Sequence, residues 1–117
     1  MKKPSVPYGI SLTIIRPTGR AMDEELSKRV EKYIEIEKRA LEQIKIIVPE
    51  NSVLYIYAKD SLNMIRAYFE DALYFKEKGD NINALSALNY SYGWIDSGVR
   101  LGIFKTDNDY TKFTFFK

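Results

Sequence analysis

The sequence predicts an all-α fold, a three-helix bundle in a single domain of 117 residues. Three observations favour this fold. Apolar residues recur at three- and four-residue spacing, which is the helical period. Capping residues and helix breakers divide this repeat into segments at residues 23–48, 53–78 and 81–104. The apolar content of 45% is typical of a chain that buries a core.

Residues 1–22 are predicted to form a basic, proline-containing arm rather than a helix. The arm holds four basic residues and no acid, and its three prolines exclude a helix. Alternating polarity over residues 10–15 predicts a short strand. Lys2 and Lys3 precede an apolar stretch too short for a signal peptide, and no apolar run reaches the roughly 20 residues that span a bilayer. We therefore expect a cytoplasmic protein without a membrane segment.

The first helix, residues 23–48, is predicted to begin at Asp23 as the N-cap, because an acidic cap satisfies free backbone N–H groups. Its apolar stripe is interrupted by Glu37. Pro49 is expected to end the helix, since proline removes a backbone donor and clashes with the preceding turn.

The second helix, residues 53–78, follows Asn51 or Ser52 as the cap. Its first residues, VLYIYA, are rich in strand-forming types, but the apolar repeat continues through them and favours a helix. Gly79 is expected to end this helix, and Asp80 to cap the next one. A stop and a start so close together predict an antiparallel helical hairpin of residues 53–78 and 81–104.

The third helix, residues 81–104, is predicted to be central, because its apolar arc covers more than half of its circumference. A narrow arc of small residues is expected to let neighbouring backbone come close, namely Ala84, Ser91, Gly98 and Gly102. Gly93 lies on the polar side, and the pattern does not explain it. The tail, residues 105–117, has strand-like alternation. Its segment 111–116 is expected to pair with residues 10–15, either within one chain or across a dimer.

Composition argues against the common kinds of enzyme site. The chain has no cysteine and no histidine, which excludes thiolate metal sites, Cys nucleophiles and the commonest general base. Asp71, Glu77 and Asp80 crowd one end of the second helix and offer a Mg²⁺ site, but capping and a solvated surface are the preferred interpretation. We expect no enzyme activity, no cofactor and no bound metal.

The favoured hypothesis is a non-enzymatic protein–protein interaction module. We expect it to form homo-oligomers and to bind a protein partner that the sequence does not identify. The apolar arc of the third helix is wider than packing against two short helices requires. Its outer side is therefore the candidate interaction face, which comprises Tyr90, Trp94, Asp96, Arg100 and Leu101. The alternative is a nucleic-acid-associated module that uses the basic arm and exposed tyrosines. Asp96 and Arg100 also fit a simple exposed ion pair.

Residues 74–104, YFKEKGDNINALSALNYSYGWIDSGVRLGIF, resemble the archaeal domain of unknown function 357 family. The shared elements are the EKGD hairpin, Ala84, the aromatic run 90–94, the acid at 96 and the glycines at 98 and 102. The resemblance implies a small helical bundle in an archaeal cytoplasm and implies no activity. A weaker resemblance is to HEPN helical domains, whose ribonuclease members use an Arg and a nearby His. Since this chain lacks histidine, that activity does not carry over.

Overall fold

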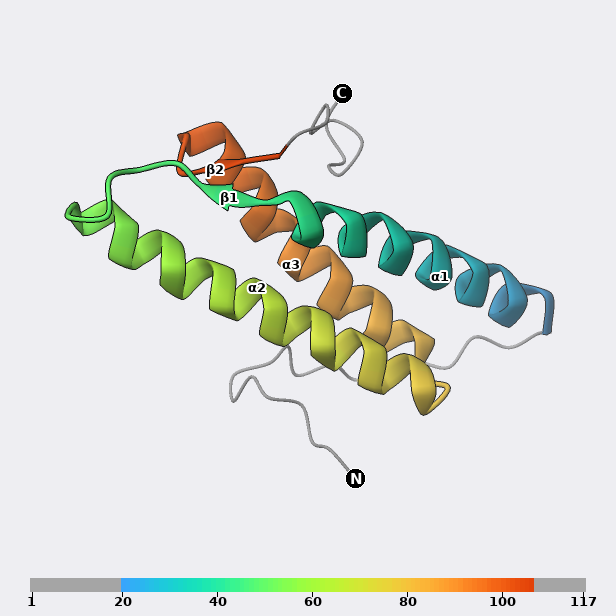
Figure 1. The fold of residues 1–117 in the computed structure, drawn as a ribbon. Coiled ribbons are helices and arrows are strands. Elements are labelled where there is room, and N and C mark those ends of the chain that lie inside the picture. Colours follow the sequence, from blue (N-terminus) through green and yellow to red (C-terminus); the bar gives the residue numbers. More distant parts are fainter. Residues whose placement is uncertain (1–19, 107–117) are drawn as a thin grey trace.

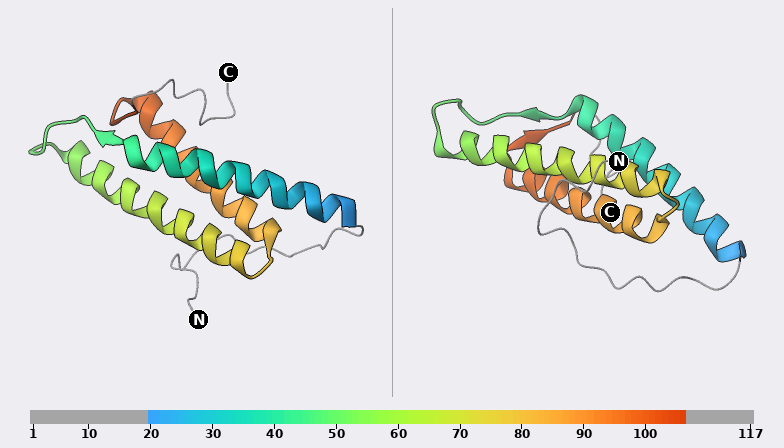
Figure 2. Two further views of the ribbon diagram at one scale, coloured as in Figure 1. Left: turned by 45° about the vertical axis from the view of Figure 1, so that its right-hand side comes forward. Right: turned by 90° about the horizontal axis from the view of Figure 1, so that it is seen from below.

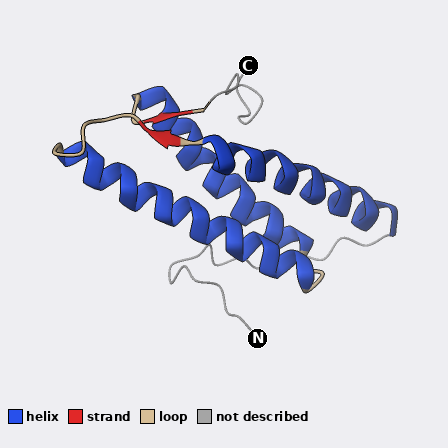
Figure 3. Ribbon diagram, viewed as in Figure 1, coloured by secondary structure: helices blue, strands red, loops and turns tan. Residues whose placement is uncertain are grey.

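Three long helices and one short pair of strands make up the computed structural model, which describes residues 20–106 (Figure 1). The predicted all-α fold class is confirmed, with the strands confined to one end of the bundle (Figure 3). In chain order the elements are α1 (Arg20–Gln43), β1 (Lys45–Ile46), α2 (Val53–Glu77), α3 (Asn81–Leu101) and β2 (Phe104–Lys105).

Helix α3 is central, as the sequence predicts. It runs antiparallel beside α2 and also packs against α1, whereas α1 and α2 touch each other over a shorter stretch (Figure 2). Two clusters of buried side chains form the core. One joins α1, α2 and α3 near the strands, and the other lies toward the α2–α3 hairpin.

The predicted hairpin and its caps are confirmed. Gly79 takes a positive φ of 78°, and the Asp80 N–H donates to the Phe75 carbonyl at 2.8 Å, which closes the end of α2. The Asp80 side chain then accepts from the Asn83 N–H at 3.2 Å and caps α3. At the start of α2, the Ser52 hydroxyl accepts from the next turn in the same way, so Ser52 rather than Asn51 is the cap.

The predicted limits of the first helix are wrong at both ends. Helix α1 begins at Arg20, so Asp23 lies in its first turn and is not the N-cap. It ends at Gln43 instead of residue 48. The residues before Pro49 are rich in branched side chains, which fit a strand better than a helix, and proline disfavours helical geometry in the residue before it. The chain instead pairs Ile46 with Phe104 in an antiparallel ladder.

The third helix ends at Leu101 instead of residue 104, because Gly102 adopts a φ of 94° that few other residues tolerate. Gly102 is exposed, and a Cβ added there would have no neighbouring atom within 4 Å. Its assignment as a close-packing residue is therefore wrong, and its role is to terminate the helix. Ala84 and Ser91 are fully buried.

Gly98 does allow a close approach, but the approaching group is a ring instead of a helix backbone. A Cβ on Gly98 would overlap the Phe104 ring of β2, which folds back against the last turn of α3. The predicted strand segments 10–15 and 111–116, and nearly all of residues 1–22 and 105–117, lie outside the described residues. Their pairing therefore stays a prediction.

Candidate interaction surface

The five predicted interaction residues lie along the outer side of α3. Tyr90 and Leu101 are 38% and 62% exposed. The Arg100 Nε donates to the Asp96 carboxylate at 2.8 Å, one helical turn away. This pair borders an open depression whose other lining residues are Gly93 and Ser97. An exposed ion pair at this spacing contributes only about 0.3–0.5 kcal/mol, so the contact alone does not indicate recognition.

The aromatic residues of this face are engaged within the chain. The Tyr90 ring lies 4.4 Å from the buried Tyr68 ring of α2, centroid to centroid, and 6.4 Å from the Trp94 ring in an edge-on contact. Trp94 also packs against the core. The outer side of α3 therefore presents polar groups together with two exposed large apolar side chains, Tyr90 and Leu101.

A larger exposed apolar area lies at the start of α2, which the sequence analysis did not select. We call it the α2-end surface. Its members are large apolar side chains that stand at least 44% exposed, with Val53 at 83% and Ile56 at 70%. They are Ile47, Val53, Leu54, Ile56 and Tyr57.

The local sequence explains why this surface is apolar. Residues 53–57 are five consecutive large apolar side chains, and each is turned about 100° from the last, so the run encircles the helix. The core-facing side of α2 continues through Ala58, Ser61 and Ile65, which are buried. Val53 and Ile56 lie off that side and face solvent. The sequence feature that could have identified this surface is the unbroken run of five large apolar residues.

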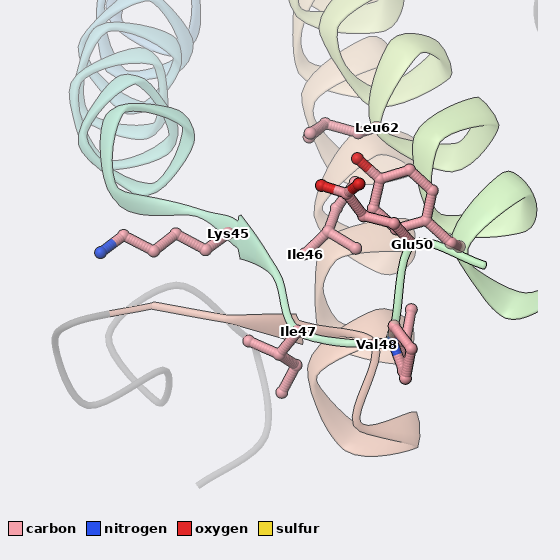
Figure 4. Close-up of a pocket in the computed structure, with 8 residues that line it drawn as sticks. Lys45, Ile46, Ile47, Val48, Glu50 and Leu62 are labelled. Carbon is pink, nitrogen blue, oxygen red and sulfur yellow. The ribbon is translucent and has the colours of Figure 1, made fainter. Parts of the chain in front are cut away.

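An open groove adjoins the α2-end surface, between residues 45–50 and α2. Ile46 and Leu62 lie on its inner side, while Lys45 and Ile47 point outward (Figure 4). This alternation is the ordinary consequence of strand geometry at β1. Ile47 is thereby exposed at the strand end of the bundle.

Charged residues of both signs surround the α2-end surface, and all of them are exposed. Glu50 precedes α2, and Lys59 and Asp60 follow Ile56 by about one turn. Lys45 and Lys105 are paired opposite each other in the strand ladder. The rim is therefore mixed in charge and nearly neutral.

A buried carboxyl group links α1 to α3 inside the core. Glu37 is 0% exposed, and its carboxyl contacts the hydroxyl of Ser91, which is also 0% exposed. Among the described residues, the other oxygen, Oε1, has no hydrogen-bond partner. Loss of hydration raises the pKa of Glu37 from 4.5 to about 8, although the Ser91 contact lowers it in part. Tyr92 is buried as well, and its loss of hydration raises its pKa. The negative charge of Glu37, when that carboxyl is ionised, raises the pKa of Tyr92 further.

The contacts of Ser91 indicate where the Glu37 proton lies. The Ser91 Oγ also lies 3.0 Å from the Leu88 carbonyl oxygen, and one hydroxyl supplies a single hydrogen. Both contacts are satisfied when the protonated Glu37 carboxyl donates to Ser91 and Ser91 donates to Leu88. The geometry and the raised pKa thus agree on a neutral carboxyl at pH 7.

The comparison with protein families agrees with the resemblance noted in the sequence. A family model described as protein of unknown function (DUF357) matches residues 32–104, more than half of the chain. The chain belongs to this family. The match covers the second half of α1 and the whole of α2 and α3, so it includes both Glu37 and the α2-end surface of this DUF357 protein.

A solved relative shares the fold. The crystal structure of protein AF1782 from Archaeoglobus fulgidus, also a DUF357 protein, matches with a TM-score of 0.60 and 24% identity. The match covers 73% of this chain and 97% of the other. No curated protein matches the sequence.

Two further features concern metals and membranes. Within residues 20–106 of this DUF357 protein, no group of three acidic side chains lies close enough together to hold a metal ion. Asp80 caps α3, as expected, but Asp71 is buried and does not belong to a solvated surface. No helix in the described part of the chain is long and apolar enough to cross a membrane.

Proposed function

We propose that this DUF357 protein is a non-enzymatic protein–protein interaction module and that the α2-end surface is its contact surface. The observation that carries the proposal is the exposure of four large apolar side chains among the first five residues of α2, namely Val53, Leu54, Ile56 and Tyr57. Single exposed apolar residues are ordinary on a protein, but a contiguous group of them is typical of an interaction site.

The composition of the surface supports a protein partner. Apolar and aromatic side chains at the centre with a charged rim are the usual anatomy of a protein–protein interface. Val53, Ile56 and Tyr57 occupy the first two turns of a long helix whose remainder is anchored against α3, so the surface needs little reordering on binding.

The environment of Glu37 supports a role outside catalysis. A strongly shifted pKa is a common sign of an active site, but structural burial shifts pKa values as well. Glu37 and Ser91 are both 0% exposed between packed helices. A general acid must come within hydrogen-bond reach of its substrate, and these positions offer no such access.

The outer side of α3 is the less favoured contact surface, since Tyr90 and Trp94 are occupied by contacts within the chain. The nucleic-acid alternative depends on the arm of residues 1–22, nearly all of which lies outside the described residues. That alternative and the cytoplasmic location stay predictions.

Site-specific photo-crosslinking tests the proposed surface. A benzophenone amino acid is placed at Ile56 and, as the control, at Leu73, which is an exposed apolar residue farther along the same helix. The proposal expects discrete protein adducts from position 56 in native extract and none from position 73. Equal adducts from both positions, or none from position 56, would overturn it.

A further inference from the structure

We propose that Glu37 and Ser91 form a pH-sensitive switch between α1 and the α2–α3 hairpin. The proton on Glu37 holds α1 against the hairpin, and loss of that proton releases α1 while the hairpin stays folded. Three features of the structure carry this inference: how little α1 buries, what surrounds Glu37, and how Ser91 shares its one hydrogen. The switch does not depend on the α2-end surface or on what binds there.

Helix α1 is held by few buried side chains. Among its described side chains three are buried, namely Val30, Glu37 and Ala40. Their spacing of seven and three residues places them on one side of the helix. Half-buried side chains such as Tyr33 and Leu41 add to the contact. Because one of the three buried groups is a carboxyl, the protonation of Glu37 bears directly on whether α1 stays docked.

The α2–α3 hairpin is packed more extensively than α1. Helix α2 buries six side chains and α3 buries seven, and the turn between them is closed by Gly79 and Asp80. The N-terminal end of α1 projects beyond this turn (Figure 2). Residues 44–52 join α1 to the hairpin at the other end, where β1 pairs with β2. Since segments with few buried contacts open before the rest of a protein, α1 is the part expected to open on its own.

The groups around Glu37 favour the protonated carboxyl. Ser91 and Tyr92 lie near it on α3, and Tyr33 lies one turn before it on α1. The Tyr33 and Tyr92 rings meet edge-on with their centroids 5.9 Å apart, which brings the two helices together beside Glu37. All three neighbours are hydroxyl groups, and a hydroxyl does not carry the positive charge that would stabilise a carboxylate.

No cation of the other described elements offsets a charge at Glu37. Lys38 and Arg39 follow it on α1 but are exposed, as are the two lysines of the strand ladder. On the buried side of α2 the titratable groups are Tyr68 and Asp71, which also lack a positive charge. Burial, and not a charged neighbour, raises the pKa of Glu37 to about 8. A carboxylate at this position would be a buried charge without a counter-ion, which is strongly unfavourable.

The Ser91 hydroxyl satisfies its neighbours only when Glu37 is protonated. The carboxyl then donates to Ser91, and Ser91 donates to the Leu88 carbonyl at 3.0 Å. Without the proton, the single Ser91 hydrogen serves either Glu37 or Leu88. The second Glu37 oxygen, Oε1, has no hydrogen-bond partner among the described residues. Loss of the proton thus leaves a buried charge with at most one donor, and release of α1 returns that charge to water.

The direction of the switch follows from the two protonation states. In released α1, Glu37 is hydrated and its ordinary pKa of 4.5 applies, whereas in docked α1 its pKa is about 8. Between these values the docked state holds a proton that the released state gives up. Rising pH therefore favours release, and the opening constant is expected to increase by up to about tenfold per pH unit.

Hydrogen–deuterium exchange of the full chain, read for each helix by mass spectrometry, tests the switch between pH 5 and 8. Native protein is compared with Glu37→Gln at the same pH, so that the chemical effect of pH on exchange cancels. The glutamine amide can donate to Ser91 and has no proton to lose, so it mimics the protonated acid throughout. Conditions are chosen in which reclosing is faster than exchange.

Two results are expected. In the native chain at pH 8, amides of residues 30–43 should open roughly tenfold or more as often as those in the middle of α2 and α3. The ratio of native to Glu37→Gln exchange rates in residues 30–43 should rise with pH, by up to about tenfold per pH unit. Glu35→Gln, the same change at an exposed position of α1, is expected to exchange like the native chain.

Either of two results would overturn the switch. Equal opening of all three helices at pH 8 would show that Glu37 acts only through unfolding of the whole chain. A ratio in residues 30–43 that stays constant with pH would show that the Glu37 proton does not hold α1. Glu37→Met, a second variant without a titrating group, provides the same comparison if the glutamine chain does not fold.

Discussion

The Ser91 hydroxyl of α3 contacts the Glu37 carboxyl of α1 inside the bundle, and neither side chain is reached by solvent. An acid in this position has a physical consequence. The unfolded chain ionises it at an ordinary pKa, but the folded chain keeps the proton until a much higher pH. The stability of the bundle is therefore linked to proton uptake at one residue.

The stability of the folded chain is expected to fall as pH rises. Between the ordinary pKa of 4.5 and the folded pKa of about 8, the folded state holds a proton that the unfolded state releases. The Glu37 contribution is thus complete below pH 4.5 and is lost progressively by about pH 8, at up to about 1.4 kcal/mol per pH unit.

Glu37→Gln removes this titration and is the matched variant. Urea unfolding at several pH values between 5 and 8 should show the variant gaining on the native chain as pH rises, because glutamine has no proton to lose. A stability difference that does not change with pH would contradict the assignment of a neutral buried carboxyl.

Ser91→Ala is expected to lower the free energy of unfolding by about 1–3 kcal/mol, because it leaves a buried carboxyl without its hydrogen-bond partner. Denaturant unfolding of the single and double variants with Glu37→Gln measures the coupling. Strict additivity of the two changes would show that the residues do not act together.

The glycines of α3 should respond in opposite directions to alanine. At Gly98 the added Cβ would overlap the Phe104 ring, and overpacking of this kind costs about 1–3 kcal/mol. At Gly93 nothing lies within 4 Å, so alanine should add up to about 1 kcal/mol through helix propensity. Thermal melts of both variants decide the matter, and equal melting temperatures would contradict the observed packing of Phe104.

Gly102→Ala is expected to destabilise the chain by roughly 1–2 kcal/mol, because its positive φ is strained for a residue with a Cβ. Gly102→Asn is the milder control, since asparagine tolerates this conformation better. The order of melting temperatures should be native, asparagine, alanine. An alanine variant as stable as the native chain would mean that α3 does not end at Gly102 in solution.

The sequence predicted the helices well where local chemistry decides them. Gly79 and Asp80 mark the hairpin because their backbone and side-chain preferences act within a few residues. The end of α1 was less predictable, since Ile46 leaves the helix to pair with Phe104, almost 60 residues away. Such a distant pairing partner has no local signature in a single sequence.

The candidate surface shows the same contrast between features that local sequence determines and features that distant packing determines. Periodicity located Tyr90 and Arg100 on the outer side of α3, because a wheel shows which positions share a side of one helix. It did not show that Tyr68 would cover part of Tyr90 from α2. Val53 and Ile56 lie off the core-facing side of α2, and the unbroken apolar run of residues 53–57 was a signal for their exposure that the periodicity argument did not use. Glu37 was visible as a break in the apolar stripe, but its partner Ser91 was not.

The central claim is that a protein covers the α2-end surface, and thiol labelling measures this most directly. Because the chain has no cysteine, Val53→Cys introduces a single thiol at that surface, and Leu73→Cys provides a matched control on the same helix. The account predicts that maleimide labelling at position 53 is slower in native extract than in purified protein, while labelling at position 73 is the same in both. Labelling of position 53 at one rate under both conditions would contradict the claim.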